Sequence, residues 1–511
     1  MQLQYSVGNI GGVALALILL PAIIRGFYRA YFDHLACYKG QKLWAASSIP
    51  ASYYQIRGTL HHQLASLHTT YGPIIRTGPY NLSYSTGDAW GDIYEARPQL
   101  KKFGKVIPDS SSGAHSILSV PDDSNHKRIR HNFAPGFSDK ALREQEPRIT
   151  TYIDILINKL RDINEPVDIA ELLQFASVDI IGDLIFGGPF QCLEHSTLHA
   201  SHSHLKHLDT FMLKLRIGMV NFEPLDRLLF FCIKRPGSFQ GAERIHRTFV
   251  SKKVGSRMQS REVRTDFMTY AIENMHTENG ISRKELDETS AVLVLAGSET
   301  TATTMAGLLY FVLREPSIRR TLVKEIRDAF SCETEITIGR VSNLQYLSAV
   351  VQETLRLLPP AVQNIPRITP SQGHTIAGQY VPGFTVVGIS HWATYHSENN
   401  FRDSSYFLPA RWLGEETYTK DHKSSFKPFS SGPRNCLGMN LAVSEIKLIA
   451  ARLLLDFDME LCPESENWTR EMKAFGVHEK GPLMIRYQAV TSSSRSYESR
   501  TARYCSPRHQ Q

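Results

Sequence analysis

Apolar residues recur at helical spacing along much of the chain. Five stretches show this pattern clearly: residues 141–160, 177–186, 286–314, 343–358 and 440–457. Short runs typical of strands are fewer, at residues 74–76, 82–84, 374–376 and 385–388. The balance predicts a mainly α fold with small β-sheets. A polar, aromatic-rich connector is expected at about residues 33–60. Because no long linker or internal repeat interrupts the chain from there to about residue 488, we expect one large domain over residues 31–488.

The two ends of the chain differ from this domain. Residues 1–24 carry no charged side chain, and residues 8–24 are mostly apolar. About 20 such residues cross a hydrocarbon core of roughly 30 Å, so residues 1–30 are predicted to form one transmembrane anchor. Arg25 and Arg29 follow the apolar run, which favours a cytoplasmic domain. A cleaved signal peptide is the alternative, although no basic segment precedes the run. Residues 489–511, rich in Ser and Arg, are expected to be a disordered tail.

Residues 286–314 are also long enough to cross a membrane. Glu299 lies near the middle of this segment, where a carboxylate would be costly in lipid. A buried helix that crosses the core of the domain is therefore the preferred interpretation.

Composition and net charge exclude few classes of function. The formal net charge of +7 is small for 511 residues. The seven cysteines are odd in number, widely spaced and without a CxxC pair, which argues against a disulfide framework and a zinc site.

One cysteine has surroundings that the other six lack. Phe429, Gly432, Arg434, Cys436 and Gly438 complete the pattern F-x-x-G-x-R-x-C-x-G immediately before an apolar helix. Glycines let the chain turn sharply beside a flat ligand, and a helix N-terminus favours a negative sulfur. The pattern is typical of a thiolate that binds a metal. A buried structural cysteine in a glycine-rich turn is the alternative.

This loop resembles the haem-binding loop of the cytochromes P450. The resemblance implies the cytochrome P450 fold and a haem b cofactor, whose iron takes Cys436 as its axial ligand. It also implies that Phe429, Arg434 and Gly438 contact the cofactor.

The resemblance continues upstream of the loop. Glu353 and Arg356 match the family's E-x-x-R motif, and Arg411 matches its downstream arginine, so the three would form a buried charge network behind the haem. Taken alone, Glu353 and Arg356 are an ordinary pair on one helix face.

Basic residues resemble the family's contacts to the haem propionates. His126 precedes Arg130 by four residues, which places both on one helix face, and Arg367 matches a further propionate contact. A solvated basic face is the alternative for each. We assign Lys127 and Arg128 to such a face.

Glu299 and Thr300 lie in the sequence AGSETT, similar to the family's oxygen-activation motif. The resemblance implies that these two catalytic side chains relay protons to oxygen, and that Gly297 leaves room for it. The alternative is a polar stripe whose Thr hydroxyls bond back to helix carbonyls.

Within the family, the sequence is most similar to membrane-anchored fungal enzymes of secondary metabolism, near those that hydroxylate trichothecene-type terpenoids. The segments behind this likeness are residues 40–44, 71–76, 137–143 and 392–396. It implies a monooxygenase of the endoplasmic reticulum membrane that inserts one atom of O2 into a C–H bond. The substrate would be an apolar terpenoid or polyketide intermediate of mycotoxin-type biosynthesis. Its pocket would draw on residues 102–118, 205–231, 292–300, 361–365 and 475–478.

Electrons are expected from outside the chain. No G-x-G-x-x-G opens a βαβ unit and no flavin domain is present, so NADPH would act indirectly through a separate NADPH-cytochrome P450 reductase. That partner would dock near Lys127, Arg128, Lys423 and Lys427; no nucleic-acid partner is expected. Two alternatives remain: an isomerase or dehydratase of this fold that needs no reductase, and a membrane haem protein without catalysis.

Overall fold

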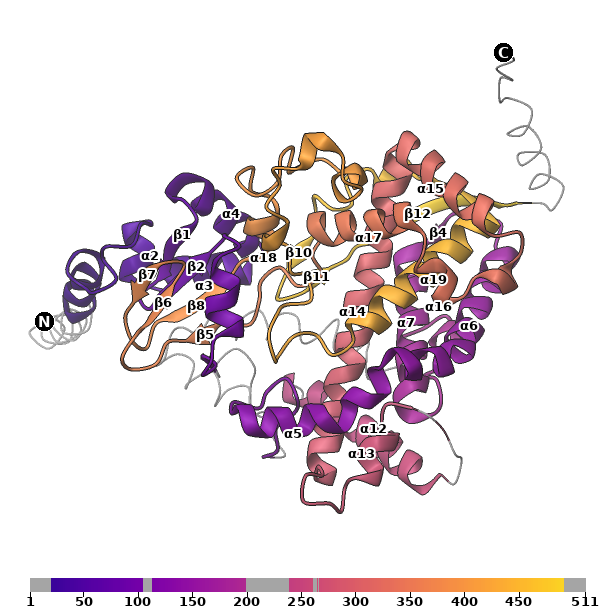
Figure 1. Ribbon diagram of the computed structural model, residues 1–511, viewed down its shortest axis with the longest axis horizontal. Helices are drawn as coiled ribbons and strands as arrows, with labels where there is room; N and C mark the ends of the chain where they lie inside the picture. The colour runs from indigo at the N-terminus through magenta and orange to yellow at the C-terminus, as the bar shows by residue number, and fades with distance from the viewer. Residues whose placement is uncertain (1–19, 104–112, 199–238, 261–263, 265, 491–511) are drawn as a thin grey trace, which may run out of the picture.

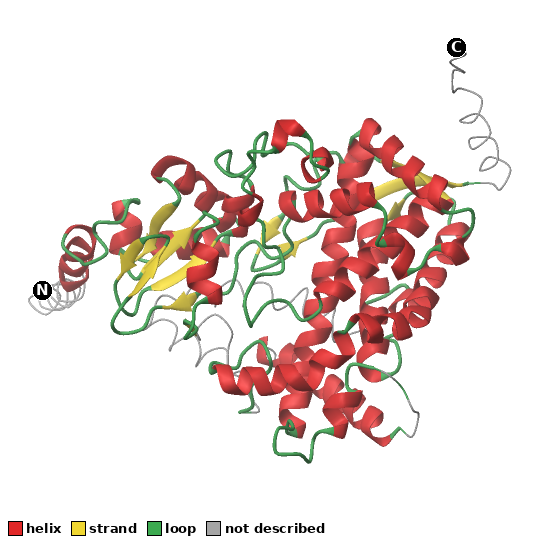
Figure 2. Ribbon diagram, viewed as in Figure 1, coloured by secondary structure: helices red, strands yellow, loops and turns green. Residues whose placement is uncertain are grey.

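The computed structural model describes residues 20–103, 113–198, 239–260, 264 and 266–490. Helices dominate these parts of the chain and the strands form small sheets, which confirms the expected mainly α architecture (Figures 1 and 2). Most of the strands lie toward the N-terminal end of the molecule, and the long helices pack together at the other (Figure 1).

The helices that the later argument uses follow one another along the whole chain. Their bounds are α2 Lys42–Ala46, α3 Ile49–Ile56, α4 Leu60–Tyr71, α5 Asp123–Phe133, α6 Asp139–Asp162, α7 Ile169–Phe186, α12 Phe239–Gln259, α14 Arg283–Arg314, α15 Pro316–Ala329, α17 Gln345–Leu357, α18 His391–Tyr395 and α19 Met439–Asp456.

Strands form one larger mixed sheet, one small sheet and two hairpins. The larger sheet has the order β1-β2-β8-β5-β3, in which only β2 and β8 run parallel. The small sheet has the order β4-β12-β9, and the hairpins are β6-β7 and β10-β11. The bounds are β1 Ile74–Gly78, β2 Asn81–Tyr84, β3 Lys101–Lys102, β4 Val167–Asp168, β5 Arg367–Ile368, β6 His374–Ile376, β7 Gln379–Val381, β8 Val386–Ile389, β9 Phe457–Leu461, β10 Lys473–Ala474, β11 His478–Glu479 and β12 Met484–Ala489.

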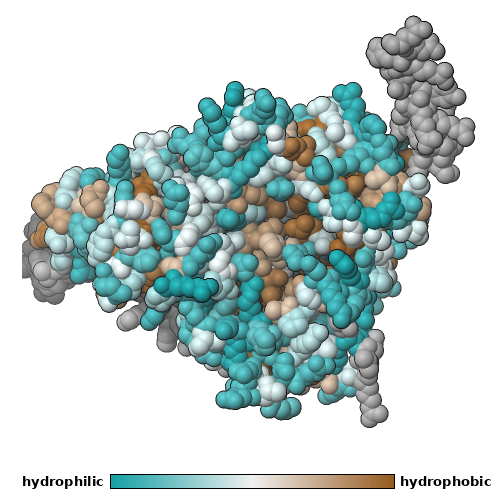
Figure 3. Space-filling model, in the orientation of Figure 1, coloured by the Kyte–Doolittle hydropathy of each residue, from teal (hydrophilic) through white to brown (hydrophobic). Residues whose placement is uncertain are grey.

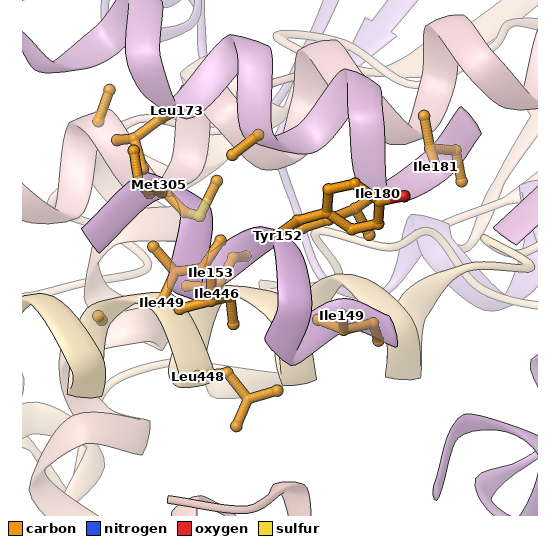
Figure 4. Close-up of a cluster of buried hydrophobic side chains, with 14 of the residues drawn as sticks. Ile149, Tyr152, Ile153, Leu173, Ile180, Ile181, Met305, Ile446, Leu448 and Ile449 are labelled. Atoms are coloured by element: carbon orange, nitrogen blue, oxygen red, sulfur yellow. The ribbon is translucent and has the colours of Figure 1, made fainter. Parts of the chain in front are cut away.

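Helix α14 is the central element of the core. It begins at a capping box, in which Ser282 and Glu285 bond each other's backbone N–H groups, and it ends just before Pro316. Residues on α6, α7, α14 and α19 meet in one hydrophobic cluster (Figure 4). Among the described residues, α14 is the one helix long and apolar enough to cross a membrane, but 67% of its most apolar window is buried. It is a core helix, as its mid-span carboxylate indicated.

The chain ends fall mostly outside the described residues. Residues 20–31 are helical, whereas the rest of the expected anchor, residues 1–19, is not described. The expected tail is likewise outside from residue 491 onward. Strand β12 ends at Ala489, one residue past the boundary expected at 488. The stretch after the anchor holds helices α2 and α3, which its sequence pattern did not predict.

Candidate active site

The cysteine loop closes on itself immediately before α19. The backbone N–H of Cys436 donates to the carbonyl of Phe429 at 2.9 Å, and Asn435 N–H donates to Gly432 at 3.1 Å. Gly432 has φ 73°, and a Cβ there would lie 2.1 Å from the carbonyl oxygen of Tyr94. Only glycine fits this approach. Gly438 is the N-cap of α19, so the sulfur stands at a helix N-terminus as the sequence suggested.

The Cys436 side chain is accessible, although protein surrounds it on most sides. Burial raises the pKa of its thiol, while the N–H of Gly438 and the charge of Arg130 oppose that shift. Among the described residues, no group of three or more His, Cys, Asp or Glu side chains could hold a metal ion. A metal here would therefore depend on this single thiolate and on ligands that the protein does not supply.

Two buried cations face each other across strands β3 and β5. Lys102 and Arg367 are direct partners in the antiparallel register. They are only 6% and 5% exposed. Neither Lys102 Nζ nor Arg367 Nε has a hydrogen-bond partner in the described part of the chain. Burial, with Arg434 and Arg367 nearby, lowers the pKa of Lys102 to about 7. Like charges directly opposite each other destabilise a sheet, so this pair needs an anion.

The sequence-predicted basic residues lie around the same pair. His126 is buried on α5, and burial, followed by Arg434 and Arg130, lowers its pKa to about 3. Arg130 reaches the cysteine loop, where it donates to the backbone O and side-chain Oδ1 of Asn435 at 2.7 and 2.8 Å. Arg434 pairs with Asp123 at 2.9 Å and donates to the carbonyl of Val120.

Arg128 does not lie on the solvated face that we expected. Its guanidinium pairs with Glu285 at 2.5 Å and donates to the carbonyl of Gly280 at 2.6 Å. The carboxylate that caps α14 thus also binds α5. Lys127 is exposed, as predicted.

These groups fit the haem that the resemblance implies. Four basic side chains and one neutral imidazole gather beside the accessible sulfur: Lys102, Arg130, Arg367 and Arg434, with His126. Among the described residues, Asp123 forms an ion pair with Arg434 and also lies near Arg367, where burial lowers the pKa of the guanidinium and Asp123 opposes that shift. A flat macrocycle with two acidic edge groups would supply the missing negative charge. Lys102 was expected only as the first residue of a pocket segment and not as a cofactor contact, because its three-lysine neighbourhood resembles an ordinary surface. Its pairing with Arg367 indicates the second role.

The structure brings the predicted charge network together. Arg356 pairs with Glu353 through two bonds of 2.7 and 2.9 Å, and Arg411 approaches the same carboxylate at 3.5 Å. All three side chains are fully buried. Sequence reasoning missed two members: Trp412 donates to Glu353 at 2.8 Å, and Asp421 pairs with Arg411.

The middle of α14 borders an open space although the helix runs through the core. Leu295 and Ala296 are exposed there, and hydrophobic side chains gather in a hollow over this part of the molecule (Figure 3). Gly297 does not face that space as we expected. A Cβ on Gly297 would lie 2.9 Å from Ile181, so glycine permits close packing of α14 against α7.

The two predicted relay residues have different partners. Thr300 donates its hydroxyl to the carbonyl of Ala296 at 2.6 Å, the back-bonding that we named as the alternative. The carboxylate of Glu299 pairs with Lys480, which sequence reasoning missed because Lys480 lies 181 residues away. The predicted pocket residues 104–112 and 205–231 lie outside the described residues.

Comparison with known proteins agrees with this geometry. Residues 44–486 match the family model "Cytochrome P450". The chain is 37% identical to cytochrome P450 monooxygenase cpaH of Aspergillus oryzae, over 92% of each chain. It is 37% identical to cytochrome P450 monooxygenase lcsI of Purpureocillium lilacinum, over 94% of each. It is 35% identical to cytochrome P450 monooxygenase astA of Talaromyces wortmannii, over 92% of this chain and 95% of the relative. Coverage of nearly the whole length and the assembled cysteine site lead to one conclusion: the chain belongs to the cytochrome P450 family and is a P450 monooxygenase.

Proposed function

We propose that this enzyme hydroxylates an apolar small molecule of fungal secondary metabolism, a terpenoid or polyketide intermediate of mycotoxin type. The balanced reaction is R–H + O2 + NADPH + H⁺ → R–OH + H2O + NADP⁺. The observation that carries the proposal is the accessible Cys436 beside buried cations that lack an anion. The fungal origin of the related monooxygenases and the likeness of four segments to terpenoid hydroxylases support the substrate class.

Different residues of the site would contact different parts of the cofactor. Cys436 would bind the iron, with Phe429 and Gly438 beside it. Lys102, Arg130, Arg367 and Arg434 would neutralise the propionates, and the neutral imidazole of His126 would donate a hydrogen bond to one of them. Glu353, Arg356 and Arg411 would keep the loop in place from behind. When bound, haem supplies the activation of O2 that no amino-acid side chain can supply.

Protons and substrate would be handled on the α14 side. Ala296 is small and exposed, so a substrate could approach this part of α14. We assign Glu299 and Thr300 to proton delivery, since a carboxyl group and a hydroxyl group can pass protons in turn. Thr300 would have to release its bond to Ala296 to do so.

Electrons would come from NADPH through a separate reductase. Among the four lysines and arginines that we assigned to its docking face, Arg128 is engaged by Glu285. Lys127 and Lys423 are exposed and remain candidates.

We further propose a single-pass anchor in the endoplasmic reticulum membrane with the catalytic domain in the cytoplasm. Large hydrophobic side chains are exposed at the N-terminal end: Leu20, Ile23, Ile24, Phe27 and Phe32, with Leu43 and Ile49 on α2 and α3. A patch of this kind usually marks a membrane or protein contact. Microsomal protein should resist extraction by alkaline carbonate, and release into the supernatant would contradict the anchor.

The central test is expression in microsomes together with a reductase. The reduced CO complex should show the red-shifted Soret band of a thiolate ligand, and Cys436→Ser should lose it. Mass spectrometry of terpenoid and polyketide intermediates should reveal products one oxygen heavier that require NADPH. Turnover without NADPH would overturn the proposal in favour of an isomerase or dehydratase.

A further inference from the structure

Lys480 lies outside every motif of the site, yet its side chain reaches the predicted relay acid. It follows hairpin β10-β11 directly, and its Nζ pairs with the Glu299 carboxylate. The same nitrogen lies 2.9 Å from Thr303 Oγ1 and 3.2 Å from Gln174 Oε1. The Lys480 side chain is 5% exposed and that of Glu299 is 27% exposed. An ammonium group has three N–H donors, and three oxygen atoms from α7 and α14 surround this one.

This arrangement fixes the direction of the Glu299 carboxylate. Thr303 belongs to the next turn of α14, where its hydroxyl donates to the carbonyl of Glu299 at 2.8 Å. Gln174 is buried on α7, which packs against α14. A charge-assisted bond from a buried, well-anchored ammonium restricts the rotamer of the acid more strongly than a neutral bond would.

We infer that Lys480 is a positioning residue for Glu299, and this inference rests on the relay role proposed for that acid. Lys480 holds the carboxylate aligned beside the space that α14 borders. Loss of Lys480 would leave a half-buried carboxylate without its cation, which is costly and would let the acid turn away. Proton delivery to oxygen would then be impaired. NADPH electrons would be lost to peroxide by the side reaction O2 + NADPH + H⁺ → H2O2 + NADP⁺.

The position of Lys480 also connects the acid to a predicted wall of the substrate pocket. The tip of its hairpin contacts the segment after α17, through a bridge between Ala361 and Val477 and a bond from Val362 N–H to Gly476 O at 3.4 Å. Both segments were expected to line the pocket. Phe475 and Gly476 also line a cavity of about 330 Å³. A ligand that displaces the hairpin would therefore also displace the cation that holds Glu299.

The test compares Lys480→Met, Lys480→Arg, Glu299→Gln and the Lys480→Met/Glu299→Gln double variant in microsomes with reductase. Two quantities are measured: the fraction of NADPH electrons recovered in product rather than in peroxide, and the infrared C–O stretch of the reduced CO complex. We expect Lys480→Met to lower the recovered fraction roughly threefold to tenfold, below the ~10²–10⁴-fold contribution of a positioned acid or base. It should also shift the C–O stretch, while Lys480→Arg retains most of both properties.

The double variant distinguishes a positioning role of Lys480 from a purely structural one. If Lys480 acts through Glu299, the double variant should be no worse than Glu299→Gln alone. Lys473→Met is the matched control, because Lys473 is exposed on the same hairpin. Additive losses, or an unchanged recovered fraction and C–O stretch in Lys480→Met, would overturn the inference.

Two further outcomes are distinguishable. If Lys480→Met fails to load haem while Lys480→Arg loads it, the role of Lys480 is purely structural and the inference is wrong. If Glu299→Gln leaves unchanged the fraction of NADPH electrons recovered in product, the proposed relay role of Glu299 is wrong, and so is the inference about Lys480 that rests on it.

Discussion

Glu353 accepts bonds from more donors than any single sequence motif indicates. Arg356, Arg411, Trp412 and the backbone N–H of Leu408 all approach its carboxylate, which is completely buried. Removing one member of a buried ion cluster costs roughly 3–5 kcal/mol, because the remaining charges lose their partner. Arg411 would keep Asp421, but Nε of Arg356 and Nε1 of Trp412 would lose their acceptor in a dry interior.

We therefore predict that Glu353→Ala abolishes haem incorporation rather than lowering turnover alone. The ratio of haem to polypeptide in purified protein measures this directly. Glu460→Ala, at an exposed position on β9, is the control and should retain a full complement. A haem-loaded Glu353→Ala protein with slow turnover would assign the network to chemistry instead of to folding.

Glu445 on α19 is a buried acid outside the predicted site. The hydroxyl of Ser177 donates to its carboxyl group at 3.1 Å. Burial raises the pKa of Glu445 to about 8. The folded protein therefore holds a proton that the unfolded chain releases near pH 4.5, so stability falls as pH rises from that value through about 8.

Glu445→Gln should remove this dependence, because the amide keeps the size of the side chain and cannot ionise. Thermal unfolding of haem-loaded protein between pH 6 and pH 9 is the measurement. The melting temperature of the wild type should fall more steeply with pH than that of the variant. Parallel curves would mean that the carboxyl group is already ionised in the folded state.

At the scale of elements, aromatic rings hold α4, α18 and β11 together. His61 and His62 of α4 contact Trp392 of α18 edge-on, with centroids 4.9 and 5.0 Å apart, and His478 of β11 lies 5.8 Å from His61. Burial, followed by neighbouring histidines, lowers the pKa of His61 to about 2, and burial lowers that of His478 to about 4. Both histidines are therefore neutral at pH 7.

Mild acid should loosen this contact. The unfolded chain takes up protons near pH 6.5 while the folded cluster resists them, so stability is lost as pH falls below about 6.5. His61→Phe keeps a ring against Trp392 and removes one basic site, and His61 Nδ1 has no bond to lose. We predict that its melting temperature declines less between pH 7 and pH 5. An identical decline in both proteins would exclude this cluster as the source of acid sensitivity.

The same elements mark how far the sequence could predict the fold. Helices α6, α14, α17 and α19 were predicted within three residues at each end, because each has a buried face and clear end signals. The first two turns of α7 were missed, since that helix is buried on all sides and shows little periodicity. Strands β4, β9 and β12 were missed because they pair over distances in the chain that no local pattern reports.

Some residues of the candidate site could likewise be predicted from the sequence, and others could not. Cys436, Glu353 and Arg411 could be found because fixed motifs surround them. Lys102 and Lys480 could not, since each is an unremarkable lysine until a strand register or a hairpin places it against a distant charge. The direction of Gly297 was also beyond a linear pattern, as it depends on how α14 rotates against α7.

At the scale of the whole molecule, the cations of the site come from distant parts of the chain. Lys102 and Arg367 belong to the larger sheet, His126 and Arg130 to α5, and Arg434 to the loop before α19. Figure 1 shows that the sheet and the long helices occupy opposite ends of the molecule. A bound dianion would therefore connect these two ends, and without it their like charges repel each other.

This arrangement predicts effects of opposite sign for Lys102→Met. Without haem, the variant should be more stable than the wild type, because one buried cation opposite Arg367 is gone. With haem, it should lose the cofactor faster, because a propionate loses a partner. Thermal unfolding of both forms and the rate of haem transfer to an excess of a haem-scavenging protein measure the two effects. Lys101→Met, on the exposed face of the same strand, should leave both unchanged. Stabilisation of both forms would mean that Lys102 contacts no anion, and the cofactor would then have to be neutralised by α5 and the cysteine loop alone.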